Sequence, residues 1–211
     1  MEIIFEDSDL YVISKPSELL SVPGRLPENK DSVLSRLQEK GQAHCAHRLD
    51  MPTSGLMVVA KNKTSLRHLN KQFSNRKVCK RYQAIVHGLP EQDAHTIEAA
   101  IICDWPNRPK QIIRADGKAS TTNVQVLERH PKKNISVLAL EPVTGRSHQL
   151  RIHCEHWGYP ILGCEFYAPE DVRSRATRLC LHASELAFSH PRTEESLSFN
   201  AAINLMSFVE D

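Results

Sequence analysis

Residues 47–55 read HRLDMPTSG and stand directly before an apolar run at 56–60, LMVVA. The run has the length and the residue types of a buried β-strand. Pro52 and Gly55 are turn-forming residues, so they place Asp50 in a loop that this strand holds in position. A carboxylate held in this way can face a cleft while its backbone stays fixed. By itself, however, a carboxylate beside an arginine is more often part of a surface ion pair.

Outside this segment, short β-rich runs alternate with turn residues along most of the chain. Helical patterns are few, chiefly at residues 32–39 and 65–75. Together these patterns predict the α+β class with a mostly antiparallel sheet. The expected strands are at residues 10–14, 56–60, 82–87, 122–127, 135–140 and 184–188.

The composition is that of an ordinary globular protein. A chain of 211 residues with 40% hydrophobic content should bury about 70% of the surface that its unfolded form exposes, so it needs no disulfide or metal to stabilise a core. Its six cysteines form no C-x-x-C pair, which favours reduced thiols in the cytoplasm. The first residues are acidic, and no apolar run approaches membrane-spanning length, so we expect neither an export signal nor a membrane segment.

Charge is distributed unevenly along the chain. The 27 basic residues nearly balance the 25 acidic ones. Residues 47–164, however, hold 18 basic and 9 acidic side chains, a net charge of +9, whereas both flanking segments are acidic. The middle of the chain is therefore where a polyanion would bind.

The most basic segment, residues 61–81, holds eight Lys and Arg residues and no acidic residue. Its apolar residues repeat at helical spacing, with Thr64 or Ser65 as the expected N-cap, and Arg67 and Lys71 lie one turn apart on another face. Such a run is usually a solvated helix surface. The lack of any compensating carboxylate favours contact with phosphates instead.

Three separated motifs resemble those of the RluA-type pseudouridine synthases. They are the HRLDMPTSG loop, Lys80-Arg81-Tyr82 and the segment 145–153, GRSHQLRIH, in the order that this family has. The resemblance extends over nearly the whole chain. It implies an isomerase that acts on uridine in RNA, on an α+β fold with a mixed, mostly antiparallel sheet and a cleft across its middle. The reaction needs no redox cofactor, nucleotide or metal.

Two further stretches, 19–25 and 102–111, are similar to family members that modify both large-subunit ribosomal RNA and a tRNA anticodon stem-loop. Two residues depart from the family pattern: Glu18 stands where the family has glycine, and Cys164 stands where it has aspartate. Larger members carry an S4 RNA-binding module before the HRLD loop, but only 46 residues precede it here. We therefore expect one catalytic domain, 1–211, that binds RNA by itself as a monomer without an obligate protein partner.

The resemblance also implies catalytic roles for three residues. Asp50 is the nucleophile or base beside the ribose, and the sequence does not choose between the two. Arg151 pairs with Asp50 and keeps it ionised, or it is only a structural ion-pair partner. Tyr82 offers a ring on which the uracil stacks and a hydroxyl that can move a proton.

Further basic residues are expected to contact the RNA. Arg48 is the expected wedge, a flat cation that stacks in the gap left by the flipped nucleotide, although it could simply bind phosphate. Arg108 and Lys110 lie in a turn with Trp105, which suits contact with a folded RNA loop. The alternative there is a buried Trp105 with two exposed cations. The full expected set is Arg48, Arg67, Lys71, Lys80, Arg108, Lys110 and Arg146.

Two other functions fit the sequence less well. A non-catalytic RNA-binding module or chaperone would not need Asp50, Tyr82 and Arg151 together. A nucleic-acid hydrolase using Asp50 and a histidine would need a positioned water, and no metal motif suggests one. His153, Cys154 and His156, three candidates in four residues, lack the geometry of a structural zinc site. His153 also belongs to the motif GRSHQLRIH that carries the resemblance, so core packing and hydrogen bonding are expected for it.

Overall fold

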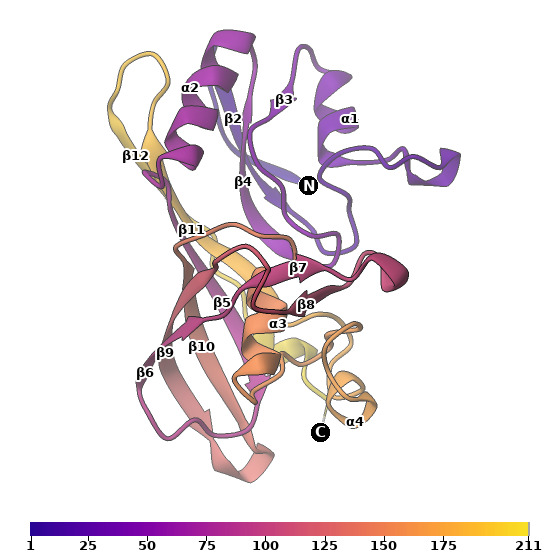
Figure 1. Cartoon of the computed structure of the whole chain (residues 1–211). Helices are drawn as coiled ribbons and strands as arrows, with labels where there is room; N and C mark the ends of the chain where they lie inside the picture. Colours follow the sequence, from indigo (N-terminus) through magenta and orange to yellow (C-terminus); the bar gives the residue numbers. More distant parts are fainter. Residues whose placement is uncertain (211) are drawn as a thin grey trace. The chain divides into compact units, whose positions relative to one another are not determined.

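The computed structural model describes residues 1–210, which form two compact units. The first unit contains residues 1–80 and 183–202. The second contains residues 81–182 and the segment from 203 onward. Figure 1 labels most helices and strands of both units.

The first unit is built on a sheet in the order β1-β2-β4-β11, with β3 paired to β4 and β12 to β11. Strands β2 and β4 are antiparallel, in a register that runs from Leu10 opposite Ala60 to Lys15 opposite Gly55. Every residue of β4 is buried, which explains why this strand reads as a continuous apolar run. The strands are β1 (Glu2–Glu6), β2 (Leu10–Lys15), β3 (His44–Cys45), β4 (Ser54–Ala60), β11 (Leu181–Ser189) and β12 (Ser196–Asn200).

Both predicted helices occur in this unit, as α1 (Val33–Gln38) and α2 (Lys63–Ser74). The predicted N-cap of α2 is wrong: Asn62 is the cap, and its side chain accepts a hydrogen bond from the Ser65 backbone N–H at 2.8 Å. The hydroxyl of Ser65 instead donates to Asp9. Leu69 on α2 is fully buried, while Arg67 and Lys71 are exposed.

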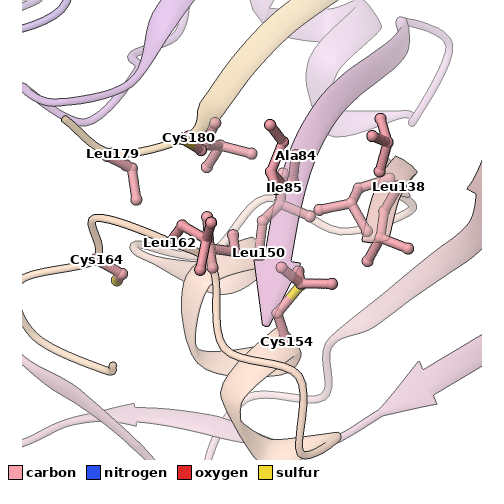
Figure 2. Packing of buried hydrophobic residues seen from close by; sticks show 14 of the residues in the cluster. Ala84, Ile85, Leu138, Leu150, Cys154, Leu162, Cys164, Leu179 and Cys180 are labelled. Carbon is pink, nitrogen blue, oxygen red and sulfur yellow. The ribbon is translucent and has the colours of Figure 1, made fainter. Parts of the chain in front are cut away.

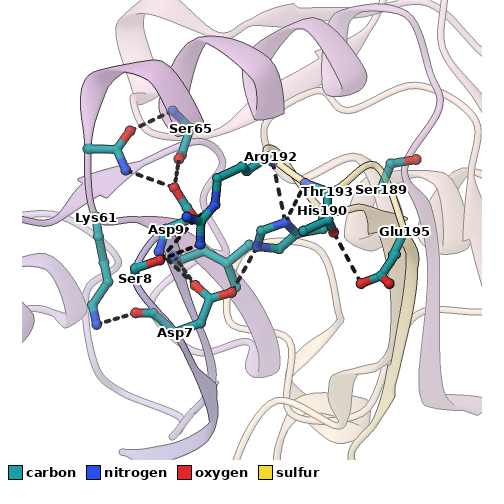
Figure 3. Close-up of polar contacts among 12 residues, drawn as sticks. Asp7, Ser8, Asp9, Lys61, Ser65, Ser189, His190, Arg192, Thr193 and Glu195 are labelled. Atoms are coloured by element: carbon teal, nitrogen blue, oxygen red, sulfur yellow. Dashed lines mark hydrogen bonds and ion pairs between the residues drawn. The ribbon is translucent and has the colours of Figure 1, made fainter.

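A polar cluster joins the β1–β2 turn to the loop after β11 (Figure 3). Asp7 accepts hydrogen bonds from the backbone N–H groups of Asp9 and Leu10 and from Nε2 of His190 at 2.8 Å. Arg192 forms an ion pair with Asp9 at 2.8 Å. The ligand atoms of Asp7, Asp9 and His190 lie within 4.8 Å of one another, but the contacts above engage all three in an ionic network within the protein.

This network makes the stability of the first unit dependent on pH. Burial alone would raise the pKa of the Asp7 carboxyl, but its hydrogen bonds outweigh burial and hold the pKa below its usual value. A depressed carboxyl pKa contributes stability above the unfolded pKa, and this contribution is lost as the pH falls through the folded pKa. We expect Asp7→Asn to lower the Tm at pH 7 and to differ less from wild type at pH 3. Thermal melts across this range test it, with the exposed Asp93→Asn as control.

The second unit contains a sheet in the order β5-β10-β9-β6 and a separate hairpin, β7–β8. The described pairs of these strands are antiparallel. The strands are β5 (Cys79–His87), β6 (Ala94–Glu98), β7 (Ile101–Cys103), β8 (Gln111–Ile113), β9 (Thr121–His130) and β10 (Ile135–Pro142). The helices are α3 (Gln149–His156) and α4 (Glu170–Arg173), and short 3-10 turns include η2 (Trp105–Asn107).

The core of the second unit lies between its sheet and α3 (Figure 2). Leu150 and Cys154 of α3 pack in one buried cluster with Ile85 of β5 and Leu138 of β10. Cys154 and Cys180 are free thiols, as the sequence predicted, and burial raises the pKa of Cys180 to about 11. A thiol with so high a pKa is unreactive at neutral pH.

The structure confirms the α+β class and all six predicted strands. Helix α3 was not predicted, because residues 149–154 are all buried and include polar side chains. A helix buried on all sides lacks the alternation of polar and apolar faces that marks an amphipathic helix. Strands β1 and β12 were missed because each has only five residues, three of them exposed and none fully buried.

Candidate active site

The loop that carries Asp50 is held by polar side chains from the end of β2 and the turn after it. Lys15 is only 1% exposed. Its ammonium donates to the carbonyl oxygens of Pro16, Leu19 and Met51 at 2.9, 2.7 and 2.8 Å. A buried ammonium satisfied by three carbonyls is a strong local constraint, because losing any partner leaves a polar group desolvated. The backbone immediately after Asp50 is therefore fixed.

Two serines complete this support. Ser21 donates its hydroxyl to the Leu49 carbonyl at 2.7 Å and accepts from the Leu49 N–H at 3.0 Å. Ser17 donates to the Pro52 carbonyl at 2.7 Å. The residues on either side of Asp50 are thus hydrogen-bonded to segment 15–21. The half-buried Asp50 carboxylate therefore projects from a backbone that is held rigid.

Gly55 ends the HRLDMPTSG segment at a position where the backbone requires glycine. It has a φ of +113°, and a Cβ atom there would lie 2.3 Å from the Ala183 carbonyl oxygen of β11. Only glycine fits both the positive φ and this close approach. The final residue of the HRLDMPTSG segment is therefore required by packing of β4.

His47, the first residue of the segment, has a structural role. Its Nε2 accepts a hydrogen bond from the Val58 N–H at 3.1 Å, and its ring stacks on Phe73 at 4.6 Å. Burial, with a smaller effect of the Lys80 charge, lowers the pKa of His47 to about 3. A neutral imidazole whose Nε2 lone pair is engaged with the backbone is not an available base at that atom.

The first unit also holds five of the predicted RNA-contact or catalytic residues. Arg48, Arg67 and Lys71 are exposed. Lys80 is partly buried, and burial lowers its pKa. These four cations and Asp50 all belong to the first unit, and three of the cations come from the basic segment 61–81.

Tyr82 and Arg151 belong to the second unit. Tyr82 lies on β5 opposite Leu140 of β10 and packs, half-buried, against the hydrophobic core. Because β5 is paired with β10 at this position, the backbone that carries the Tyr82 side chain is fixed.

Arg151 is a buried cation on α3, 2% exposed. Its guanidinium lies 5.2 Å from the ring centroid of Phe166 and 5.4 Å from that of Tyr167, and its Nε donates to Sγ of Cys164 at 3.4 Å. Guanidinium over aromatic rings is a favourable and orienting contact. Phe166 and Tyr167 were not singled out from the sequence, since two aromatic residues in a loop carry no motif.

Tyr167 is itself fixed by hydrogen bonds. Its hydroxyl lies 2.7 Å from Nδ1 of His148 and accepts from the Gln111 N–H at 2.9 Å. His148 has a φ of +55° at the start of α3. The rings beneath Arg151 are therefore connected to both α3 and β8.

Gln149 and His153 of the GRSHQLRIH segment belong to a buried network of hydrogen bonds. Gln149 accepts from the Arg146 N–H and from the Thr144 hydroxyl, and donates to Thr122 at 3.0 Å. His153 contacts the Thr122 hydroxyl through Nδ1 at 2.9 Å and the Ala99 carbonyl through Nε2 at 3.2 Å. The interpretation of His153 as a core hydrogen-bonding residue is confirmed, because both of its ring nitrogens have protein partners.

Arg108, Lys110 and Arg146 also lie in the second unit. Arg146 is exposed in the loop before α3. Arg108 and Lys110 follow η2 in the β7–β8 hairpin, beside a Trp105 that is 66% exposed. The alternative of a buried Trp105 is therefore wrong. Lys110 also lines a cavity of about 560 Å³ together with residues of α3 and of loop 166–169.

Comparison with known proteins identifies the class. Residues 9–156 match the family described as RNA pseudouridylate synthase. The chain belongs to this family, and it is an isomerase that converts uridine in RNA to pseudouridine.

Individual relatives and solved structures agree. The chain is 49% identical over 203 residues to the dual-specificity RNA pseudouridine synthase RluA of Pasteurella multocida, covering 95% of this chain and 92% of that protein. It is 47% identical over 201 residues to the protein of the same name from Escherichia coli K12, covering 94% and 91%. The structure of human RNA pseudouridylate synthase domain containing 1 matches with a TM-score of 0.79 at 28% identity, covering 96% of this chain and 83% of that one.

No helix within residues 1–210 combines the length and the apolar character needed to cross a membrane.

Proposed function

We propose that this isomerase has dual specificity and modifies particular uridines in structured large-subunit ribosomal RNA and in a tRNA anticodon stem-loop. The relatives named above are called dual-specificity RNA pseudouridine synthases, and the similarity covers nearly their whole length. The observation that carries the catalytic part is the Asp50 loop, whose neighbouring carbonyls are held by Lys15, Ser17 and Ser21. Reverse-transcription mapping of pseudouridine in total RNA, with and without the protein, tests the assignment. If pseudouridines disappear from only one of the two RNA classes when the protein is absent, the enzyme has single specificity.

The reaction breaks the bond between C1′ of the ribose and N1 of the uracil and forms one between C1′ and C5. The proton on C5 is lost and N1 gains one, so atoms and electrons balance without an oxidant or reductant. Asp50 acts either as a nucleophile at C1′ or as a base that removes a proton from C2′. Arg151 is the proposed charge partner of Asp50, and its fixed position over Phe166 and Tyr167 supports a preorganised role.

Tyr82 is the proposed stacking residue for the detached uracil, and its hydroxyl is the proposed proton carrier. We expect Tyr82→Phe to bind substrate normally but to lose about 10²-fold or more in turnover, within the range of general acid-base contributions. Tyr82→Ala should also weaken binding, because the stacking surface is removed. Single-turnover assays and filter binding separate the two effects. Full turnover by the phenylalanine variant would leave the hydroxyl without a catalytic role.

RNA contact is proposed for both units. Arg48, exposed and two residues before Asp50, is the proposed wedge that fills the space of the flipped nucleotide. Contact with phosphates is proposed for the other exposed or partly exposed cations of the predicted set, which are Arg67, Lys71, Lys80, Arg108, Lys110 and Arg146.

Affinity for a stem-loop RNA should fall steeply with salt. Replacing Arg67 and Lys71 by alanine should reduce the slope of log K against log salt by up to about 2, if each contacts one phosphate. The matched control, Arg25→Ala with Lys40→Ala, removes the same charge from exposed positions in the same unit. Fluorescence anisotropy at several salt concentrations measures both slopes. Equal slopes in the two double variants would make the α2 residues a solvated surface only.

The remaining proposals concern the setting of the reaction. The RNA substrate is the only partner that the proposed function requires, and the protein acts as a monomer in the cytoplasm. Sedimentation of the free protein and of its stem-loop complex tests the monomer, and a one-to-one complex is expected.

A further inference from the structure

The β7–β8 hairpin of the second unit has a tip that its own hydrogen bonds make rigid. Asp104 donates its N–H to the Lys110 carbonyl, and Lys110 donates its N–H to the Asn107 carbonyl, both at 3.0 Å. The Asn107 N–H and side-chain amide both bond to Asp104, at 3.0 and 2.8 Å. Where the tip joins β8, the Gln111 N–H donates to the Tyr167 hydroxyl. A tip built in this way presents its side chains from a fixed backbone.

Trp105, the first residue of η2, is the most exposed large hydrophobic side chain among the described residues, at 66%. The guanidinium of Arg108 lies 4.7 Å from its ring centroid. An indole with this much exposed surface contributes little to the core, and its flat aromatic face can stack on another ring. The cation covers one face of the ring and limits its rotation.

The chemistry around this indole favours a nucleic-acid base over a protein partner. Besides Pro106 and Pro109, the residues next to Trp105 in the tip are Asp104, Asn107, Arg108 and Lys110, which are polar or charged. The centre of a protein interface, in contrast, is depleted of charge. The Asp104 carboxylate is bonded to Asn107 within the turn. Arg108 thus supplies positive charge next to a flat aromatic face, the combination that binds single-stranded nucleic acid. Lys110, whose ammonium lies 6.0 Å from the ring centroid of Phe166, adds positive charge to the same hairpin.

We propose that Trp105, with Arg108 stacked on it, is a platform for one unpaired base of the substrate RNA, distinct from the uridine that is isomerised. This proposal rests on the proposed function, because the base belongs to the RNA that the enzyme modifies. The platform selects RNAs that present an unstacked base at a fixed position in the loop. It therefore acts on substrate choice and binding, while the bond rearrangement belongs to Asp50 and Tyr82.

Tryptophan fluorescence tests the platform directly, because the chain has two tryptophans, Trp105 and Trp157. Trp157 is half-buried and stacks on His95 at 4.9 Å. In Trp157→Phe the emission comes from Trp105 alone, and titration with a synthetic anticodon stem-loop should quench it strongly. In Trp105→Phe the remaining Trp157 emission should change little. In the unmodified protein, the same RNA should protect the exposed tryptophan from quenching by acrylamide, which keeps the test available if a variant fails to fold.

Affinity measurements supply the second arm. Trp105→Ala should weaken stem-loop binding about tenfold, equivalent to ~1.4 kcal/mol, whereas Trp105→Phe should retain most of the affinity. Arg108→Lys keeps the charge but loses the planar stack, so it should weaken binding with an unchanged salt slope. Leu127→Ala, at a 44% exposed apolar position of β9, is the matched control and should bind as wild type does.

The outcomes separate this proposal from the proposed function. If the wild-type enzyme forms pseudouridine in the stem-loop but Trp105 emission and acrylamide access are unchanged at saturating RNA, the platform is wrong and the enzyme assignment stands. If the wild type binds the RNA with quenching but forms no pseudouridine in it, the substrate assignment fails and the platform stands. Replacing each unpaired base of the stem-loop in turn by an abasic residue should abolish quenching at one position other than the target. Undiminished quenching with every single replacement would overturn the one-base platform.

Discussion

Asp50→Asn is expected to abolish pseudouridine formation while leaving the fold and RNA affinity unchanged. The carboxylate is presented from a loop whose flanking carbonyls are already satisfied by Lys15 and Ser21, so an isosteric amide disturbs none of these bonds. An amide can neither attack C1′ nor remove a proton from C2′ at a useful rate. We expect turnover to fall by about 10³-fold or more, equivalent to ~4 kcal/mol of barrier.

Single-turnover assays with saturating enzyme measure this loss, and binding of a labelled stem-loop shows whether affinity is retained. Asp31→Asn, at an exposed carboxylate paired with Arg36, is the matched control and should be fully active. Residual activity of Asp50→Asn within about tenfold of wild type, or ~1.4 kcal/mol, would remove Asp50 from the chemical step. Retained binding without turnover also distinguishes an enzyme from an RNA-binding module, because the module would have no turnover to lose.

The elements that could be predicted from the sequence are those whose apolar residues form a continuous run or repeat at helical spacing. Strand β4 was predictable because all its residues are buried and its residues 56–60 are apolar. Helix α2 was predictable because its apolar residues Leu66, Leu69 and Phe73 repeat at helical spacing. Helix α3 was not predictable, because Gln149, Arg151 and His153 are buried polar residues, and each has at least one partner 13 or more residues away in the sequence. Their burial is satisfied by Thr122, Ala99 and the aromatic rings of loop 166–169. Only the folded chain brings such partners together.

The candidate site shows the same division. Asp50, Tyr82 and Arg151 could be named because they stand in motifs, and the exposure of Arg67 and Lys71 followed from helical spacing. The support of the site could not be named in this way. A lysine at the end of a strand is ordinarily exposed, and nothing in the residues around Lys15 indicates that it is buried against Met51, 36 residues further along the chain. Trp105 was left undecided because exposure of one indole depends on the tertiary packing of its hairpin.

Lys15 therefore carries the second large prediction. In Lys15→Met the side chain keeps its length and loses its charge and its three N–H donors. The carbonyls of Pro16, Leu19 and Met51 then lose a partner in a buried position, which costs about 1–3 kcal/mol for each group left unsatisfied, less the gain from burying an apolar side chain. A net loss of about 3 kcal/mol in the free energy of unfolding should lower the Tm by roughly 6–12 °C in a chain of this size. Differential scanning calorimetry measures the shift.

The matched control is Lys30→Met, the same substitution at an exposed lysine whose ammonium also donates to backbone carbonyls, those of Gly24 and Arg25. Because water replaces a lost donor at an exposed site, this change should stay within about 0.5 kcal/mol of wild type. Activity adds a second readout. At a temperature where Lys15→Met is fully folded, a loosened Met51 backbone should lower kcat through misplacement of Asp50 and should change KM little, since the exposed phosphate-binding cations are untouched. A Tm shift no larger than that of Lys30→Met, together with an unchanged kcat, would show that the Asp50 loop is held by its own turn geometry and that Lys15 is dispensable to it.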